Sequence, residues 1–322
     1  MLFKRLLIIL FAAVLVLPGC GQSRSDSAPE QVTLVLDWTP NTNHTGFFAA
    51  DELGYFAEEG LSFAFVQPPE DGALALVAAG RADFGISFQE EVLLAANART
   101  PLPVVAIAAV VEHNTGGILS LSESGITRFR DLEGMRYGSW QVPIYDELIK
   151  ECVRLDGGNP GNVDFVPNSA LDNITGIQRD FDAVWVFEGW DKVIADRHGF
   201  ETNFIAFRDI SPIFDYYTPV LITSEERLNS DVTAKFLRAA ARGFEYARDN
   251  PEEAADILHR HVPEMDRELL AASQRYLSGE YYKGAKWGYI DSERWNAFFS
   301  WMRENEFVDS DAANEAFRNV EY

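Results

Sequence analysis

Short apolar segments alternate with helical patterns along most of the chain, and this alternation restricts the fold more than any other feature. Such an order of strands and helices favours a mostly parallel sheet that is covered by helices on both faces. The sequence therefore predicts an α/β protein. In the first third, the predicted strands and the helices between them are, in order, Val32–Trp38, 44–54, Leu61–Val66, 72–79, Ala82–Ser87, 90–98 and Val104–Val111.

The same alternation returns in the middle of the chain, and helices dominate the last hundred residues. Asn250 followed by Pro251 predicts a helix start, with Asn250 as N-cap. Roughly 300 residues beyond the N-terminal segment suit two medium-sized lobes better than one core. The elements expected in the middle are a helix start at 128–132, strand Arg136–Ser139, helix Ile144–Leu155, and strands Val163–Val166 and Ala183–Phe187.

The N-terminus has the layout of a bacterial secretory signal over residues 1–19. Lys4 and Arg5 precede an apolar run from Leu6 to Leu17, which is too short to span a bilayer comfortably. The run ends in a segment that resembles a lipobox, so we expect lipidation of Cys20 and a polar tether over residues 20–30. Two alternatives stay open, an ordinary cleaved signal with a chance cysteine and an uncleaved anchor. All three predict an extracytoplasmic domain at a bacterial cell membrane.

The chain is strongly acidic, with a formal charge of −23. Residues 1–19 carry two cations and no acids, so their removal would make the charge −25. An acidic surface repels phosphate backbones, and nucleic acid is therefore excluded as a partner.

Four segments carry a distinctive combination of motifs: LDWTPNTNHTGFFAADELGYFAEEGL (36–61), VAAGRADFGISFQEEVLLA (77–95), RDLEGMRYGSW (130–140) and the segment 224–258. Together they resemble the ThiY/NMT1-like family of periplasmic binding proteins. The resemblance implies a type II periplasmic-binding fold, with lobe 1 formed by residues 31–120 and 220–322 and lobe 2 by 121–219. It also implies the role of a substrate-binding component, whose partners would be the permease and ATPase of an ABC importer.

The first candidate site follows the first predicted strand. In open α/β sheets, ligands bind beyond the carboxyl ends of strands. A ligand there would meet a stacking surface on Trp38 and amide groups on Asn41 and Asn43, with Asp37 and His44 beside them. Asn43 could instead be a helix N-cap, and Trp38 a core residue.

The second candidate site is the segment Asp182–Trp190, which contains the predicted strand Ala183–Phe187. Alternation places Trp185 and Phe187 on one face of this strand, and Glu188 ends it. A carboxylate can accept two coplanar hydrogen bonds, from the ring N–H and the exocyclic amine of an aminopyrimidine. The alternative is that Glu188 caps a helix or meets solvent.

Further candidates occupy strand ends or connections between the predicted lobes. Contact with a ligand is geometrically reasonable for each, and so is a use in a turn or in packing. These residues are Ser87, Phe88, Gln89, Gly116, Gly117, Ser139, Trp140, Tyr216, Tyr217 and Thr218.

The resemblance leaves the ligand open between two vitamin-related aromatic compounds. A thiamine pyrimidine precursor is slightly favoured over riboflavin, for which the small Gly46 could make room. The alternative is that Gly46 serves helix packing. Few cations accompany the candidate residues, which disfavours sulfonates. No catalytic motif, metal site or cofactor is expected. The pyrimidine-synthesising branch of the fold carries a cysteine cluster, whereas this chain has only Cys20 and Cys152, the latter at a predicted core position.

Overall fold

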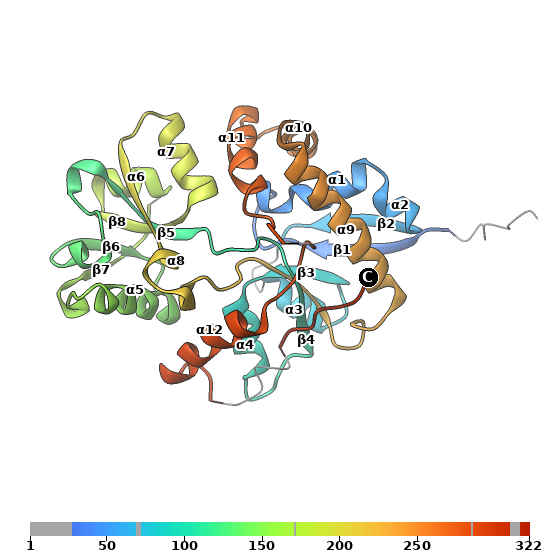
Figure 1. Cartoon of the computed structure of the whole chain (residues 1–322), viewed down its shortest axis with the longest axis horizontal. Helices are drawn as coiled ribbons and strands as arrows, with labels where there is room; N and C mark the ends of the chain where they lie inside the picture. Colours follow the sequence, from blue (N-terminus) through green and yellow to red (C-terminus); the bar gives the residue numbers. More distant parts are fainter. Residues whose placement is uncertain (1–27, 69–71, 171, 285, 310–315) are drawn as a thin grey trace, which may run out of the picture.

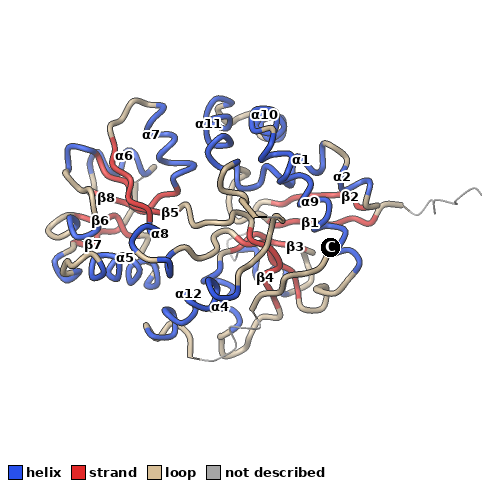
Figure 2. Tube along the Cα trace, in the orientation of Figure 1, coloured by secondary structure: helices blue, strands red, loops and turns tan. Residues whose placement is uncertain are grey.

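Two five-stranded sheets form the centres of two lobes that lie side by side (Figure 1). The computed structural model describes residues 28–68, 72–170, 172–284, 286–309 and 316–322. The strand order is β2-β1-β3-β10-β4 in lobe 1 and β7-β6-β8-β5-β9 in lobe 2. Helices pack around each sheet (Figure 2), so the predicted two-lobed α/β class is confirmed. The strands are β1 Glu30–Val35, β2 Leu61–Val66, β3 Phe84–Ser87, β4 Val104–Ala109, β5 Gly116–Leu121, β6 Arg136–Ser139, β7 Asp164–Pro167, β8 Ala183–Phe187, β9 Thr202–Ala206 and β10 Val220–Ser224.

The helices follow the predicted pattern, and lobe 1 also receives the C-terminal ones. Asn250 was predicted to cap α10, but its side-chain amide donates to the carbonyl of Tyr246, at the end of α9. The α-helices are α1 Thr45–Glu52, α2 Tyr55–Glu58, α3 Gly72–Ala78, α4 Gln89–Ala96, α5 Pro143–Leu155, α6 Asn173–Arg179, α7 Val193–Arg197, α8 Phe207–Ile210, α9 Asp231–Asp249, α10 Pro251–His261, α11 Arg267–Ser278 and α12 Ser292–Glu304.

Both sheets are mixed, which corrects the expectation of a mostly parallel arrangement. In lobe 1, β1 is parallel to β2 and β3, whereas β10 runs antiparallel to β3 and β4. In lobe 2, β6 is parallel to β7 and β8, whereas β5 is antiparallel to β8 and β9. The antiparallel strands β5 and β10 directly follow the segments that connect the lobes. The sequence analysis did not predict them or β9.

The chain crosses between the lobes twice, through residues 110–115 and 215–219 (Figure 1). The strand β5 belongs to the second sheet although it begins at Gly116, before residue 121. We therefore propose that lobe 2 begins at the first crossing, a few residues before the limit expected from the sequence. The second crossing ends at residue 219, and the return to lobe 1 at residue 220 stays a prediction.

The predicted secretory signal and Cys20 lie outside the described residues. Glu30, which was expected to end the tether, is already the first residue of β1. Within the described ranges, none of the helices combines the length and the hydropathy needed to span a bilayer.

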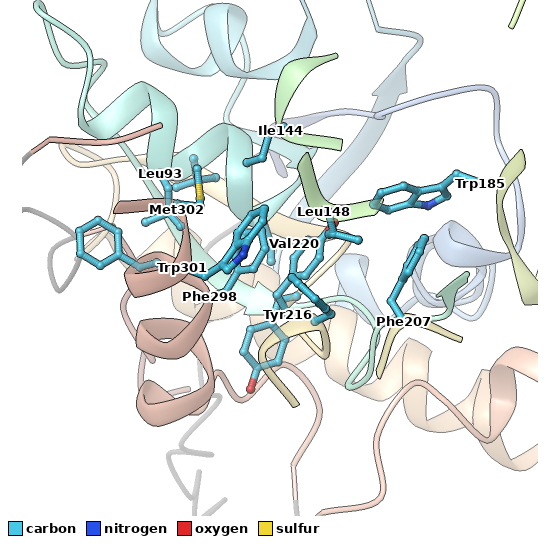
Figure 3. Packing of buried hydrophobic residues seen from close by; sticks show 14 of the residues in the cluster. Leu93, Ile144, Leu148, Trp185, Phe207, Tyr216, Val220, Phe298, Trp301 and Met302 are labelled. Atoms are coloured by element: carbon cyan, nitrogen blue, oxygen red, sulfur yellow. The ribbon is translucent and has the colours of Figure 1, made fainter. Parts of the chain in front are cut away.

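One hydrophobic cluster continues from lobe 1 into lobe 2 (Figure 3). It contains Leu93 and Trp301 from lobe 1, Leu148 and Trp185 from lobe 2, and Tyr216 from the second crossing. Cys152 is fully buried in this cluster, as its helical spacing predicted. The two lobes thus share apolar packing on the side of the crossings.

Close packing of α1 on α9 explains two glycines of lobe 1. A Cβ atom on Gly46 would lie 2.3 Å from the ring of Phe244, and one on Gly243 would lie 1.9 Å from the carbonyl oxygen of Gly46. Gly46 therefore serves helix packing, and the suggestion that it makes room for a flavin is wrong.

Replacing Gly243 with alanine should destabilise lobe 1, because the added methyl group meets backbone that cannot move aside. We expect the free energy of unfolding in urea, followed by circular dichroism, to fall by about 1–3 kcal/mol. Gly279→Ala is the matched control, because its nearest atom would be 3.6 Å away. Equal stability of the two variants would contradict this account of the helix contact.

Candidate ligand-binding cleft

A cleft of about 350 Å³ lies between the lobes and is lined by residues from both. Lobe 1 contributes the segment after β1 and the residue that precedes α4. Lobe 2 contributes the residues after β6 and β8 and the start of α6, and the second crossing closes one side. The lining residues are Asp37, Trp38, Asn41, Asn43, Phe88, Trp140, Asn173, Phe187, Trp190, Asp191, Thr218 and Pro219.

The carboxylate of Asp37 is held in place by a fully buried histidine. The two side chains meet at 2.6 Å, between Asp37 Oδ1 and His44 Nε2. The other ring nitrogen of His44, Nδ1, accepts the backbone N–H of Asn41 at 3.1 Å. Because Nδ1 acts as an acceptor, the imidazole is neutral and donates its Nε2 proton to Asp37. His44 therefore orients the acid without cancelling its charge.

The helical turn after β1 is capped by Asn41, whereas the sequence analysis considered Asn43 for that role. The side chain of Asn41 accepts the N–H of Asn43 at 2.9 Å and donates to the carbonyl of Thr39 at 3.0 Å. This use of Asn41 leaves the amide of Asn43 on the cleft wall.

A second acid, Asp191, faces the cleft from lobe 2 and was not anticipated. It lies in a short π-helix, η5 (Glu188–Lys192), directly after β8. Its Oδ1 accepts the side-chain amide of Asn173 at 2.9 Å. Burial raises the pKa of Asp191, and the hydrogen bond from Asn173 opposes that shift. The segment predicted from the sequence ends at Trp190, one residue before Asp191, and the π-helical turn that brings Asp191 to the cleft has no local sequence signal.

Three tryptophans supply aromatic surface to the cleft. Trp38 keeps 54% of its surface exposed, and its ring meets the edge of Trp190 across the lobes at a centroid distance of 6.3 Å. Trp140 is 39% exposed and packs against Tyr145 in lobe 2. An aromatic ligand could stack on the exposed faces of Trp38 or Trp140.

The electrostatic character of the cleft is negative. Among its described lining residues, Asp37 and Asp191 are the ionisable groups, and neither a lysine nor an arginine is present. No group of three or more potential metal ligands occurs in the described part of the chain. The site can therefore accept hydrogen bonds from a neutral or cationic ligand, and it offers no counter-charge to an anion.

The remaining predicted site residues lie outside the lining. His44 is buried behind Asp37. Gln89 is also buried, where its side chain accepts the N–H of Tyr217 and donates to the carbonyl of Trp295. Gly117 is a packing position, because a Cβ there would meet the carbonyl of Ile205 at 2.5 Å.

Two predicted aromatic contacts belong to the core instead. Trp185 packs against Phe207 with a distance of 4.2 Å between the ring centroids, and Tyr216 stacks on Phe298 with a centroid distance of 3.9 Å. Alternation placed Trp185 and Phe187 on one face of β8, but only Phe187, at the strand end, reaches the cleft.

Glu188 makes a contact between the lobes that the sequence analysis did not consider. Its Oε2 accepts the hydroxyl of Tyr276 on α11 at 2.7 Å. The expected role of Glu188 as an aminopyrimidine clamp thus loses its geometric basis, because the carboxylate is engaged away from the cleft lining. Asp37 and Asp191 take its place as the acids of the cleft.

The two lobes around a central cleft define a periplasmic-binding-protein fold. The alkanesulfonate-binding protein SsuA from Xanthomonas axonopodis pv. citri, solved with MOPS, superposes with a TM-score of 0.66 at 11% identity, covering 91% of this chain and 100% of that one. The aliphatic sulphonate-binding protein SsuA from Escherichia coli gives 0.64 at 14% identity, over 91% and 94% of the two chains. At such identities the similarity establishes the fold alone.

The chain belongs to the NMT1/THI5-like family, whose sequence profile matches residues 41–254. A formylaminopyrimidine-binding protein from Halalkalibacterium halodurans is 28% identical over 330 residues, covering 98% of both chains. A 4-amino-5-hydroxymethyl-2-methylpyrimidine phosphate synthase from Legionella pneumophila is also 28% identical, over 74% of this chain and 76% of its own. These findings confirm the family that the sequence motifs indicated.

Replacing Asp191 with asparagine should stabilise the ligand-free protein at neutral pH. The pKa of Asp191 is higher in the folded than in the unfolded protein, so stability is lost as the pH rises from the unfolded-state pKa through the folded-state pKa. An asparagine avoids this loss because its amide carries no charge that burial would desolvate. We expect a higher free energy of unfolding than in the wild type at pH 7, and a difference that shrinks as the pH falls toward 4. Asp180→Asn, an exposed acid of the same lobe, should change little. A lower stability of the Asp191 variant at pH 7 would refute this reading.

Proposed function

We propose that the protein is the substrate-binding component of an importer for a small amino-substituted pyrimidine of the thiamine-precursor type. The observation that carries this proposal is the composition of the cleft, in which aromatic faces surround two carboxylates without a cation. The relative from H. halodurans, which matches over nearly the whole chain, is named for binding formylaminopyrimidine. Family and site chemistry therefore support the same ligand class.

The proposed contacts follow from the hydrogen-bonding pattern of the ligand. An aminopyrimidine presents an exocyclic amine next to a ring nitrogen, and a carboxylate such as Asp37 or Asp191 can accept both groups once the ring nitrogen is protonated. The flat ring would stack on Trp38 or Trp140, and the amide of Asn43 can reach further polar atoms on its edge.

The size of the cleft favours a single-ring ligand over riboflavin. Small-molecule pockets commonly measure roughly 300–1,000 Å³, and about 350 Å³ lies at the lower end of that range. Gly46 had suggested room for a flavin, but the ring of Phe244 occupies the space beside it. Riboflavin is kept as a comparison ligand in the test below.

Binding without turnover is the proposed activity, although a synthase is among the relatives. The relative that covers 98% of the chain is named as a binding protein, while the synthase from L. pneumophila covers 74%. A protein that traps and releases a ligand needs stacking surfaces and hydrogen-bonding groups, and the cleft offers these. Formation of a hydroxymethylpyrimidine product by the purified protein would refute this part of the proposal.

The location and the partners belong to the same proposal. The secretory signal and Cys20 support an extracytoplasmic domain held at the membrane by a lipid anchor. A binding protein in that place would deliver its ligand to a permease driven by an ATPase. Mass spectrometry of the N-terminal peptide of the membrane-extracted protein would detect acylation of Cys20.

Asp37→Asn should weaken pyrimidine binding while preserving the fold, because the asparagine oxygen can still accept the proton of His44. Hydrogen bonds to a charged partner contribute about 1.5–3 kcal/mol, so we expect a dissociation constant about 10- to 100-fold higher. Isothermal titration with formylaminopyrimidine and hydroxymethylpyrimidine measures this change, with riboflavin and taurine as comparison ligands.

Asp180→Asn is the control for this titration, since it removes the same charge from an exposed position. Saturable binding of a pyrimidine with the loss confined to the Asp37 variant would support the proposal. Binding of riboflavin or taurine alone would overturn it.

A further inference from the structure

A buried acid outside the cleft lining connects the two lobes. Glu90, in the first turn of α4 in lobe 1, is only 2% exposed. Its Oε1 accepts the hydroxyl of Tyr145, on α5 in lobe 2, at 2.9 Å. Its second oxygen, Oε2, is buried and has no hydrogen-bond partner. A carboxyl group in such surroundings is costly to keep ionised.

Among the described residues, the groups that act electrostatically on Glu90 include no cation. The ionisable groups that face it are Tyr145 from α5, Tyr216 from the second crossing and Glu91 on its own helix. The neighbouring β4 and α12 contribute apolar side chains to the cluster that packs around α4 (Figure 3). The pKa of Glu90 is raised to about 8. Burial is the main cause, and the hydrogen bond from Tyr145 opposes it to a smaller extent.

The contact also reaches the ligand cleft. The ring of Tyr145 meets Trp140 edge-on at 5.8 Å, and Trp140 lines the cleft from lobe 2. Docking of Tyr145 on Glu90 therefore fixes the aromatic wall of the cleft at the same time as it joins the lobes.

We propose that Glu90 and Tyr145 form a latch between the lobes, through which closing of the cleft takes up one proton. When the lobes separate, the bond breaks and water reaches the carboxyl group, which then ionises. When they close, the carboxylate of Glu90 takes up one proton from the buffered solution, and the neutral acid keeps its contact with Tyr145. The part of this proposal that depends on the proposed binding function is that closure of the lobes traps the ligand.

The expected pH dependence follows from this exchange. An acid that titrates near 4.5 in water and near 8 when buried makes closure less favourable as the pH rises between those values. The ratio of closed to open protein should fall about tenfold per pH unit in that window. Acidic conditions would therefore favour retention of the ligand, and alkaline conditions its release.

The test measures closure without any ligand, so it is independent of the proposed substrate. Spin labels are attached to cysteines introduced at the exposed positions Ala57 in lobe 1 and Gln178 in lobe 2, with Cys20 replaced by serine. The buried Cys152 is inaccessible to the label. Pulsed electron–electron double resonance then measures the distribution of distances between the two labels, which gives the closed fraction from pH 5 to 9.

The latch predicts a closed fraction that falls with pH in the wild type and stays constant in Glu90→Gln, which keeps an oxygen for Tyr145. Tyr145→Phe should lower the closed fraction and move its midpoint to lower pH, because the neutral acid loses the hydrogen bond that holds the two lobes together. Glu188→Gln is the matched control, since it alters the other tyrosine–carboxylate bond between the lobes, and it should retain the wild-type slope. A constant distance distribution in the wild type, or the same slope in Glu90→Gln, would overturn the proposal.

Discussion

Five acids around the cleft and at the junction of the lobes are paired with neutral donors, and these pairs determine the chemistry of the cleft and of the contacts beside it. Other contacts between the lobes are ion pairs, such as Arg208–Glu280 and Arg197–Glu268. Elsewhere, surface acids commonly meet arginine or lysine, as Glu59 does with Arg238. A neutral donor orients a carboxylate but leaves its charge in place, so the negative potential must be matched by a ligand or a proton. The pairs are Asp37–His44, Glu90–Tyr145, Glu91–Ser87, Glu188–Tyr276 and Asp191–Asn173.

These pairs divide the junction into a part that meets the ligand and a part that joins the lobes. Asp37 and Asp191 stand on opposite sides of the cleft, where an amino-substituted ring between them would bring the two sides together. Glu90 and Glu188 instead receive tyrosines of the opposite lobe. Ligand recognition and lobe closure thus use the same interaction, in which a carboxylate accepts a hydrogen bond. The ligand would meet it in the cleft, and the tyrosines meet it at the contacts between the lobes.

The sequence was a good guide wherever local pattern decides the structure. Periodicity located most strands, and the residues predicted as a binding site after the first strand include Asp37, Trp38 and Asn43, which line the cleft. The errors came from contacts that only the folded chain creates. The local sequence around Trp185 does not distinguish a cleft tryptophan from a core tryptophan, and in the fold Trp185 packs on Phe207. Asp191 reaches the cleft because of the π-helix after β8, which the sequence pattern does not predict. Tyr276 lies 88 residues from Glu188, so their bond has no local signature.

The position of β10 has a consequence for the order in which the protein can form during synthesis. Lobe 1 begins first along the chain, but β10 lies between β3 and β4 of its sheet and arrives only with Val220–Ser224. Lobe 2 has all its strands in one uninterrupted stretch, from β5 to β9. Domains generally fold as units while the chain emerges. The inserted lobe can therefore complete its sheet as soon as Gly116–Ala206 are available, while the lobe that encloses it in sequence still lacks an inner strand.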